Sequence, residues 1–317
     1  MIDRERAVDR LAGCYVTIPT MFRDQDLGLD CTAVRRNVEY LLAGGMNENN
    51  ATILVAGAAG DFQTMTLQER MAVAEAVVDE IQGRIPVVMG AQSTSTRETV
   101  EIARYAERIG VEYIQVSCPY YFSHTEDDFY ELILEVARAA EVGLVVYNTY
   151  WTSTAVSIDL ATRLAEVPAV VGLKWGTYDT GFMEFAQMVT GFSERLCVID
   201  NQNHFAMSHM MGARGFENHI CNFWPEWGVK LMQVLEAKRY EEVQQMLVRV
   251  CMPFHQLWSR IEREYTSGDG YLDKLCMELV GLDSSRNRPP TRDIRERYRD
   301  SAREMLVRMG VSGLSAT

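Results

Sequence analysis

The chain has 317 residues, of which 47% are hydrophobic and 24% are charged, and its formal net charge is −13. This length accommodates one barrel of α/β units with an appendage, or two ordinary domains. The acidic balance argues against binding to nucleic acid or to an anionic membrane, because both attract basic surfaces. The N-terminus has mixed charge without the apolar core of a signal peptide, and no apolar run is long enough to span a membrane. The sequence therefore predicts a soluble, cytoplasmic protein.

The seven cysteines are scattered, odd in number and never spaced as C-x-x-C. This pattern indicates reduced core residues and predicts neither a disulfide framework nor a zinc site. The five histidines have no H-E-x-x-H or similar spacing. We therefore expect no bound metal.

Short apolar runs bounded by turn residues alternate with amphipathic patterns, which is typical of βα units in a parallel sheet. The expected strands cover residues 14–19, 52–56, 86–90, 113–117, 143–148, 170–175, 196–200 and 215–218. The expected helices between them cover residues 32–42, 67–81, 95–109, 126–140, 157–165, 181–190 and 205–211. Thr66 with Glu69, and Ser95 with Glu98, have the spacing of capping boxes at two helix starts.

Eight strands with intervening helices predict an α/β fold, a closed (β/α)₈ TIM barrel. The alternative is an open doubly wound sheet, but no G-x-G-x-x-G follows any expected strand. Beyond about residue 226 only helical patterns continue, over residues 227–237, 240–266, 271–280 and 291–309. We predict a barrel domain with the active site over residues 1–225 and a C-terminal helical region over residues 226–317.

Lys174 is unusual because only four of the 31 basic residues are lysine, and this one lies in an apolar strand. In such a barrel the chemistry lies at the carboxyl ends of the strands, where Lys174 is expected. Burial of an ammonium is costly and favours the neutral amine, which is the form that attacks a carbonyl. The alternative is a structural lysine paired with a buried carboxylate such as Asp200 or Glu217.

Two further features lie at strand ends. Tyr147 ends the neighbouring strand, where its hydroxyl could move protons to and from an imine at Lys174, although lone tyrosines often only fill cores. Residues 57–60, Gly-Ala-Ala-Gly, form a small-residue turn whose backbone N–H groups could hold a carboxylate.

Together these residues resemble the dihydrodipicolinate synthase / N-acetylneuraminate lyase family of class I, Schiff-base-forming aldolases. Residues 57–70, GAAGDFQTMTLQER, resemble the family's G-T-T-G-E-x-x-x-L-T-x-x-E-R segment. Tyr147 followed by Asn148 resembles the Y-N strand, and residues 172–174 resemble the G-[IL]-K strand. Residues 18–22 and 212–215 are similar to the P-T-P-F and G-A-x-G segments, so the resemblance extends from about residue 13 to residue 309.

The resemblance implies an imine between Lys174 and pyruvate or a longer 2-keto acid, with no metal or organic cofactor. It implies that Tyr147 transfers protons and that the positions of Ala58 and Ala59 bind the keto-acid carboxylate. It also implies a homotetramer, usually a dimer of dimers, in which Tyr121 of the P-Y-Y segment reaches the neighbouring subunit's site.

Departures from the family pattern indicate a different second substrate. Ala58 and Ala59 replace two threonines and Asp61 replaces a glutamate, so backbone anion binding is retained while the hydroxyl link between Tyr147 and Tyr121 is lost. Dihydrodipicolinate synthases have an arginine at the position of Thr152 for the second substrate's carboxylate. A role in lysine biosynthesis is therefore not expected.

The remaining candidate site residues support two more specific hypotheses about the substrate. Tyr150, Trp151 and Trp175 favour an aromatic aldehyde partner, as in hydratase-aldolases. Glu217 and Asn218, with His219, replace a usually small and aliphatic stretch and suit the hydroxyl groups of a 2-keto-3-deoxy sugar acid, the substrate of a dehydratase. The sequence thus predicts a Schiff-base-forming lyase of the pyruvate-dependent aldolase type, with a non-catalytic keto-acid-binding barrel as the alternative of another class.

Overall fold

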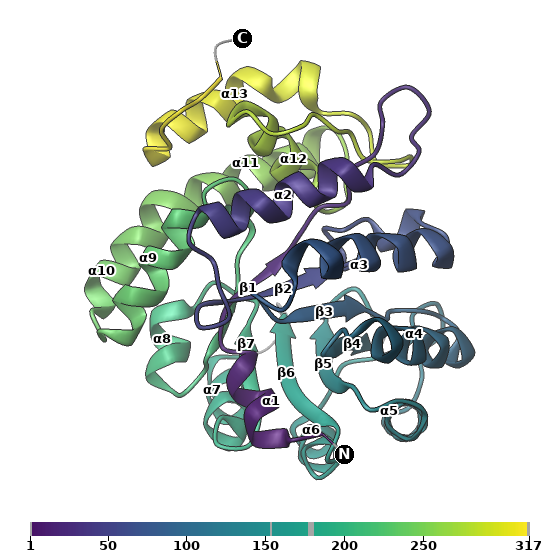
Figure 1. Cartoon of the computed structure of the whole chain (residues 1–317). Helices are drawn as coiled ribbons and strands as arrows, with labels where there is room; N and C mark the ends of the chain where they lie inside the picture. Colours follow the sequence, from purple (N-terminus) through teal and green to yellow (C-terminus); the bar gives the residue numbers. More distant parts are fainter. Residues whose placement is uncertain (1, 153, 177–180, 316–317) are drawn as a thin grey trace. The chain divides into compact units, whose positions relative to one another are not determined.

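The predicted (β/α)₈ barrel is confirmed in a computed structural model, which describes residues 2–152, 154–176 and 181–315. The strands follow one another around a closed barrel in chain order (Figure 1). The barrel closes where β1 pairs with β8, with Cys14 opposite Phe216. The strands are β1 Gly13–Thr17, β2 Ala51–Val55, β3 Val87–Gly90, β4 Tyr113–Ser117, β5 Gly143–Thr149, β6 Val170–Gly176, β7 Cys197–Asp200 and β8 Gly215–Glu217.

The chain divides into two compact units, each made of several segments. The first unit comprises residues 1–15, 47–54 and 83–217, and contains nearly all of the barrel strands. The second unit comprises residues 16–46, 55–82 and 218–317. The division at residue 225 that the sequence suggests stays a prediction.

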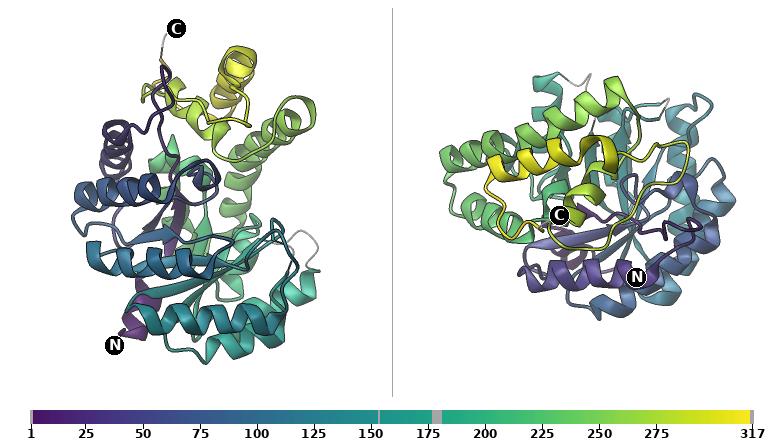
Figure 2. Two further views of the ribbon diagram at one scale, coloured as in Figure 1. Left: turned by 90° about the vertical axis from the view of Figure 1, so that its right-hand side faces the viewer. Right: turned by 90° about the horizontal axis from the view of Figure 1, so that it is seen from above.

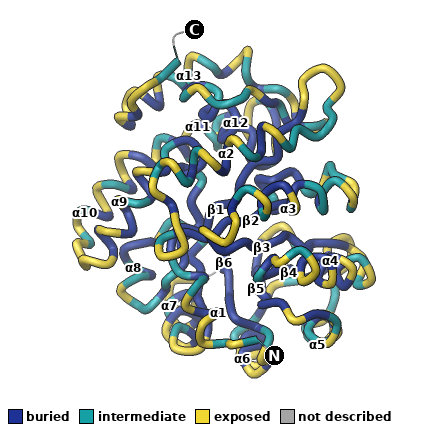
Figure 3. The backbone as a smooth tube through the Cα atoms, in the orientation of Figure 1, coloured by how far each residue is buried: buried dark blue, intermediate teal, exposed yellow. Residues whose placement is uncertain are grey.

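The first unit surrounds its strands with helices. Each of α4, α6 and α7 packs against the strand of the same number, which follows it in the chain. The strands are buried while the helices expose their outer faces (Figure 3). Ser95 caps α4 by accepting a hydrogen bond from the backbone N–H of Glu98, which is one of the two bonds of the predicted capping box. These helices are α4 Thr96–Ile109, α5 Glu126–Ala139, α6 Ile158–Ala165, α7 Phe182–Phe192 and α8 Phe205–Met210.

An additional helix, α1 (Arg4–Arg10), precedes the first strand and was not predicted from the sequence. Asp3 caps it by accepting a hydrogen bond from the backbone N–H of Arg6. Its apolar residues join the same buried cluster as inward-facing residues of the strands, and Tyr113 Oη donates a hydrogen bond to the carbonyl of Ala7 at 3.0 Å. The helix thus belongs to the core of the first unit.

The second unit is mainly helical. Thr66 and Glu69 form the predicted capping box at the start of α3. The expected helix over residues 240–266 is continuous but contains a π-helical turn, Leu247–Cys251, between α10 and α11. Helix α13 lies beside α11 and α12 (Figure 2) and begins at Arg295, four residues later than predicted. The side chain of Asp293 accepts a hydrogen bond from the backbone N–H of Arg295, and such a local bond favours a turn over a helix before this point.

The helices of the second unit are α2 Cys31–Ala43, α3 Leu67–Ile81, α9 Pro225–Glu236, α10 Tyr240–Met246, α11 Met252–Glu264, α12 Tyr271–Leu279 and α13 Arg295–Met309, with 3₁₀ turns at Phe62–Thr64 and His219–Asn222. Within the described residues, no helix combines the length and hydropathy needed to cross a membrane.

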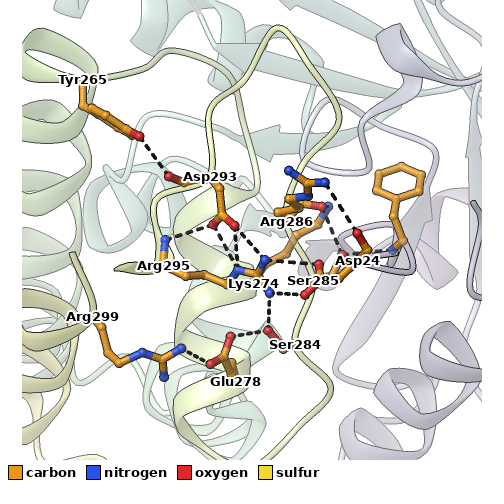
Figure 4. A network of polar contacts seen from close by, with 11 residues as sticks. Asp24, Tyr265, Lys274, Glu278, Ser284, Ser285, Arg286, Asp293, Arg295 and Arg299 are labelled. Atoms are coloured by element: carbon orange, nitrogen blue, oxygen red, sulfur yellow. Dashed lines mark hydrogen bonds and ion pairs between the residues drawn. The ribbon is translucent and has the colours of Figure 1, made fainter. Parts of the chain in front are cut away.

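A polar network joins α12 and α13 to the loop between them (Figure 4). Arg295 donates hydrogen bonds to Asp24 at 2.7 Å and to Ser284 at 2.6 Å, and Ser284 in turn donates to Glu278 at 2.5 Å. Arg299 of α13 also pairs with Glu278 of α12. The network holds the C-terminal helices together with a segment more than 250 residues earlier in the chain.

Candidate active site

Lys174 lies in β6, in the barrel interior, with only 3% of its surface exposed. Its Nζ donates a hydrogen bond to Oε2 of Glu217 at 2.5 Å. The Nζ atom also lies 4.8 Å from the ring centroid of Tyr15 and 4.7 Å from that of Tyr147. A buried ammonium without a partner would be strongly destabilising, so the carboxylate accounts for the presence of a lysine here.

Strand register brings these four residues together. Tyr147 of β5 is directly opposite Lys174 of β6, and Tyr15 of β1 is directly opposite Glu217 of β8. Side chains alternate between the two faces of a strand, so a single register position on each strand decides which side chains face the interior. Of the two carboxylates that the sequence offered as partners of Lys174, the structure pairs it with Glu217.

The hydroxyl groups of the two tyrosines have different partners. Tyr147 Oη accepts a hydrogen bond from Nδ2 of Asn201 at 3.3 Å, whereas Tyr15 Oη donates to Oε1 of Gln115 at 3.0 Å. Burial, followed by the charge of Glu217, raises the pKa of Tyr15 well above its ordinary value. Tyr15 therefore stays protonated, and its ring packs against the amine of Lys174.

Asn201 is held by the segment after β7. Asp200 accepts hydrogen bonds from Ser208 Oγ and from the backbone N–H of Gln202, both at 2.7 Å. Burial raises the pKa of Asp200 above its ordinary value. Gly176 leaves room for Asn201, because a Cβ there would lie 2.3 Å from Asn201 Nδ2.

The loop after β5 is fixed by Asn148, whose Oδ1 accepts a hydrogen bond from the backbone N–H of Val156 at 2.9 Å. The hydroxyl of Thr152 donates to the carbonyls of Thr149 and Thr154, so it is used within the loop itself. The exposed rings of Tyr150 and Trp151 lie 4.9 Å apart.

Two further predicted site residues, Trp175 and Tyr121, differ from Lys174 in their surroundings. Trp175 follows Lys174 on the same strand, so strand alternation places it on the opposite face, where it is fully buried. This position favours packing over the predicted contact with substrate. Tyr121 is 84% exposed, with its ring edge against Phe122 at 4.9 Å.

The turn over residues 57–61 belongs to the second unit. Its own hydrogen bonds use the N–H groups of Gly60 and Asp61, which donate to the carbonyls of Gly57 and Ala58. In the part of the chain that the structure describes, the N–H groups of Ala58 and Ala59 have no hydrogen-bond partner. Adjacent backbone N–H groups left free in a turn can bind an anion, as the sequence predicts for this segment.

Neighbouring segments hold this turn in place. Thr20 Oγ1 donates a hydrogen bond to the carbonyl of Gly60 at 2.7 Å. Gly270 has φ +73°, and a Cβ at this position would lie 2.3 Å from the carbonyl oxygen of Ala59. Glycine is required there both for its backbone conformation and for this close approach.

Asp61 ends the turn in a buried ion pair that the sequence analysis missed. Its Oδ2 accepts a hydrogen bond from Lys274 Nζ at 2.8 Å, and its Oδ1 accepts one from Asn287 Nδ2 at 2.8 Å. Burial raises the pKa of Asp61 and lowers that of Lys274, while their mutual attraction opposes both shifts. Because both carboxylate oxygens have protein partners, the geometry favours a structural role for Asp61 over the predicted contact with substrate.

Asn218 begins the short helix after β8, and its Oδ1 accepts a hydrogen bond from the backbone N–H of Ile220 at 3.0 Å. Its buried Nδ2 has no hydrogen-bond partner among the described residues, so this amide group can donate to a ligand. His219 Nδ1 lies 3.0 Å from Oδ1 of Asp273. The described residues contain no group of three or more His, Cys, Asp or Glu side chains that could hold a metal ion.

The chain resembles known proteins along nearly its whole length. The model of the dihydrodipicolinate synthetase family matches residues 10–309. The 4-hydroxy-tetrahydrodipicolinate synthase of Methanopyrus kandleri is 27% identical over 305 residues, which cover 95% of this chain and 97% of that protein. The synthase of the same name from Methanothermobacter thermautotrophicus is 29% identical over 220 residues, which cover 68% of this chain and 76% of that protein.

Solved structures share the fold. The chloride-inhibited dihydrodipicolinate synthase of Acinetobacter baumannii, complexed with pyruvate, superimposes with a TM-score of 0.83 at 25% identity, over 95% of this chain and 99% of that one. A protein from Clostridium difficile in complex with mannosamine gives a TM-score of 0.82 over 94% of this chain and 99% of that one, but at 16% identity it shows only the common fold.

Proposed function

Because the chain belongs to the dihydrodipicolinate synthetase family, whose members are lyases of the synthase and aldolase kind, we propose that Lys174 forms a Schiff base with a 2-keto acid. The observation that carries this proposal is the buried amine of Lys174, which contacts a carboxylate and lies against the ring of Tyr147. A lysine in such a place can lose its proton and act as a nucleophile.

The reaction starts when the neutral amine of Lys174 attacks C2 of pyruvate or a longer 2-keto acid. Loss of water gives a cationic imine, which withdraws electrons and stabilises the enamine formed by C–C cleavage or by loss of a proton from C3. Tyr147 moves protons on the substrate. Family resemblance assigns the substrate carboxylate to the free N–H groups of Ala58 and Ala59, and no metal or organic cofactor takes part.

We propose a second substrate other than that of lysine biosynthesis, because Thr152 offers no positive charge and its hydroxyl is bonded within its own loop. The exposed ring pair of Tyr150 and Trp151 supports an aromatic aldehyde, as in a hydratase-aldolase. The free Nδ2 donor of Asn218 supports the alternative of a dehydratase acting on a 2-keto-3-deoxy sugar acid.

Reduction with borohydride in the presence of pyruvate tests the Schiff base. We expect peptide mass spectrometry to find the reduced adduct at Lys174, and the K174M variant to give none. The other three lysines, Lys230, Lys238 and Lys274, serve as internal controls. An unmodified Lys174 would contradict the mechanism. Trapping without product from any aldehyde or keto acid in a panel would instead favour a keto-acid-binding barrel without turnover.

The family resemblance also leads us to propose a cytoplasmic homotetramer. The segment containing Tyr121 and Phe122 exposes two aromatic rings, at 84% and 69%, after β4. Contact with a second subunit would remove this apolar surface from water.

A further inference from the structure

We infer that Glu217 is the acid–base group that drives imine formation at Lys174. This role rests on the proposed Schiff base and adds to it a catalytic carboxylate at the nucleophile. Glu217 qualifies as a catalytic residue because its Oε2 touches the reacting atom, Lys174 Nζ, at 2.5 Å.

The geometry makes Glu217 the proton acceptor for this amine. Within the described part of the chain, the other contacts of Lys174 Nζ are the rings of Tyr15 and Tyr147, and neither ring accepts a proton. Asp200, the other carboxylate near β6, is occupied by Ser208 and by the backbone of Gln202. A proton that leaves Lys174 therefore has a direct path to Glu217.

The contact between the two groups is shielded from solvent. The side chains of Lys174 and Glu217 are 4% and 8% exposed, so both ions of the pair have lost most of their hydration. At the 2.5 Å separation of Nζ and Oε2, a proton can pass from the ammonium to the carboxylate without a bridging water. The amine produced in this way is the nucleophile that the reaction needs.

The proton balance then closes within the pair. Glu217 takes one proton from the Lys174 ammonium, and the amine forms a bond to C2 of the keto acid. A second proton moves from this nitrogen to the former carbonyl oxygen, which gives the neutral carbinolamine. Glu217 returns its proton to that hydroxyl, water leaves, and a protonated imine remains beside an ionised Glu217. The three hydrogens of the ammonium are then two in water and one on the imine nitrogen.

The same residue compensates for what the turn at residues 57–60 lacks. Alanines at positions 58 and 59 have no hydroxyl group to relay protons, and the resemblance places threonines there. A carboxylate in contact with the amine makes such a relay unnecessary for imine formation, because donor and acceptor are already within hydrogen-bond distance.

The test is the rate of borohydride trapping by pyruvate at Lys174 in the E217Q variant, measured by quenched-flow mass spectrometry from pH 5 to pH 9. We expect trapping to slow by about 100-fold or more, because general acid–base catalysis typically contributes 10²- to 10⁴-fold. The matched control is E112Q, which alters a glutamate bonded to Arg10, and this variant should trap like the wild type.

A trapping rate in E217Q equal to or above that of the wild type would overturn the inference. A carboxylate that only stabilised the protonated form of Lys174 would make the wild type react more slowly than E217Q. The E217A variant gives an independent readout that does not depend on the stability of E217Q. Added formate should restore trapping in E217A in proportion to the formate concentration. If formate does not restore trapping, the catalytic role of Glu217 is contradicted. A wild-type chain that does not trap pyruvate at all contradicts the proposed function instead.

Discussion

At the scale of single residues, two buried tyrosines allow the proposed proton transfer by Tyr147 to be tested. Tyr147 lies opposite Lys174 and accepts a hydrogen bond from Asn201, whereas Tyr113 Oη donates to the carbonyl of Ala7 in α1. Both lose only a hydroxyl group when replaced by phenylalanine. A difference between the two variants in the chemistry of a bound keto acid therefore reflects where each hydroxyl lies relative to Lys174, and not merely the loss of a hydroxyl.

We predict that Y147F slows the exchange of the methyl protons of pyruvate with deuterium by about 10²- to 10⁴-fold, because this exchange requires proton transfer at C3 of the imine. Proton NMR in deuterated water measures the exchange without knowledge of the second substrate. Y113F should exchange like the wild type, and borohydride trapping should persist in Y147F. If Y147F and the wild type exchange at equal rates, a group other than Tyr147 removes the proton from C3.

The sequence allowed some of these residues to be predicted and not others, for physical reasons. Lys174 stands out because a lysine in an apolar strand has no solvated face. Its pairing with Glu217 depends on the register of strands 43 residues apart, which only closure of the barrel decides. Lys274 is also a charged residue within an apolar segment, over residues 271–280. Because that segment is helical, a lysine there is compatible with a solvent-exposed polar face, and its burial could not be predicted.

At the scale of elements, the predicted barrel and most helix bounds agree with the structure because hydrophobic periodicity decides both. Helix α1 was missed because its seven residues include five charged ones and only two buried ones, too few to show a periodic apolar face. The π-helical turn between α10 and α11 was missed for another reason, since it retains the helical pattern and changes only the hydrogen-bond spacing.

The N-terminus of α3 leads to a prediction on pH dependence. Glu69 is the third residue of this helix, belongs to its capping box, and accepts hydrogen bonds from Arg288, which lower its pKa from 4.5 to about 2. Because the folded pKa lies below the unfolded one, the unfolded chain binds more protons in this range. The stabilisation from Glu69 is therefore fully present above about pH 4.5 and is lost as the pH falls toward 2.

The variant for this test is E69Q, compared with the wild type by urea unfolding at pH 7 and at about pH 3.5. We expect the wild type to be more stable at pH 7, by about 0.3–1 kcal/mol for an acidic group in the first turn of a helix, and the difference to shrink at the lower pH. R288M should reduce the effect of E69Q at pH 7, because the guanidinium is the largest cause of the shift. A difference that grows as the pH falls would contradict the assignment.

At the scale of the whole molecule, the second unit is assembled from three separated parts of the chain. Asp61 pairs with Lys274, Arg36 with Asp283, and the backbone N–H of Phe22 donates to Ser285 Oγ. Each of these contacts joins a segment before residue 83 to the C-terminal 100 residues. Such interleaving predicts that residues 226–317 are required for the folding of earlier segments and are no dispensable appendage.

Expression of residues 1–225 tests this requirement. Truncation removes Lys274 and leaves the fully buried Asp61 carboxylate without its cation, a change that typically costs about 3–5 kcal/mol. It also removes Asp283 and Ser285, which contact Arg36 of α2 and the backbone of Phe22. Against a total stability of about 5–15 kcal/mol for a typical domain, we expect no cooperative thermal unfolding of this fragment in near- and far-ultraviolet circular dichroism.

The full-length K274M variant breaks the same ion pair but retains the helices, so it should unfold cooperatively at a lowered temperature. A fragment of residues 1–225 that unfolds cooperatively near the wild-type temperature would show instead that the barrel folds without the C-terminal helices.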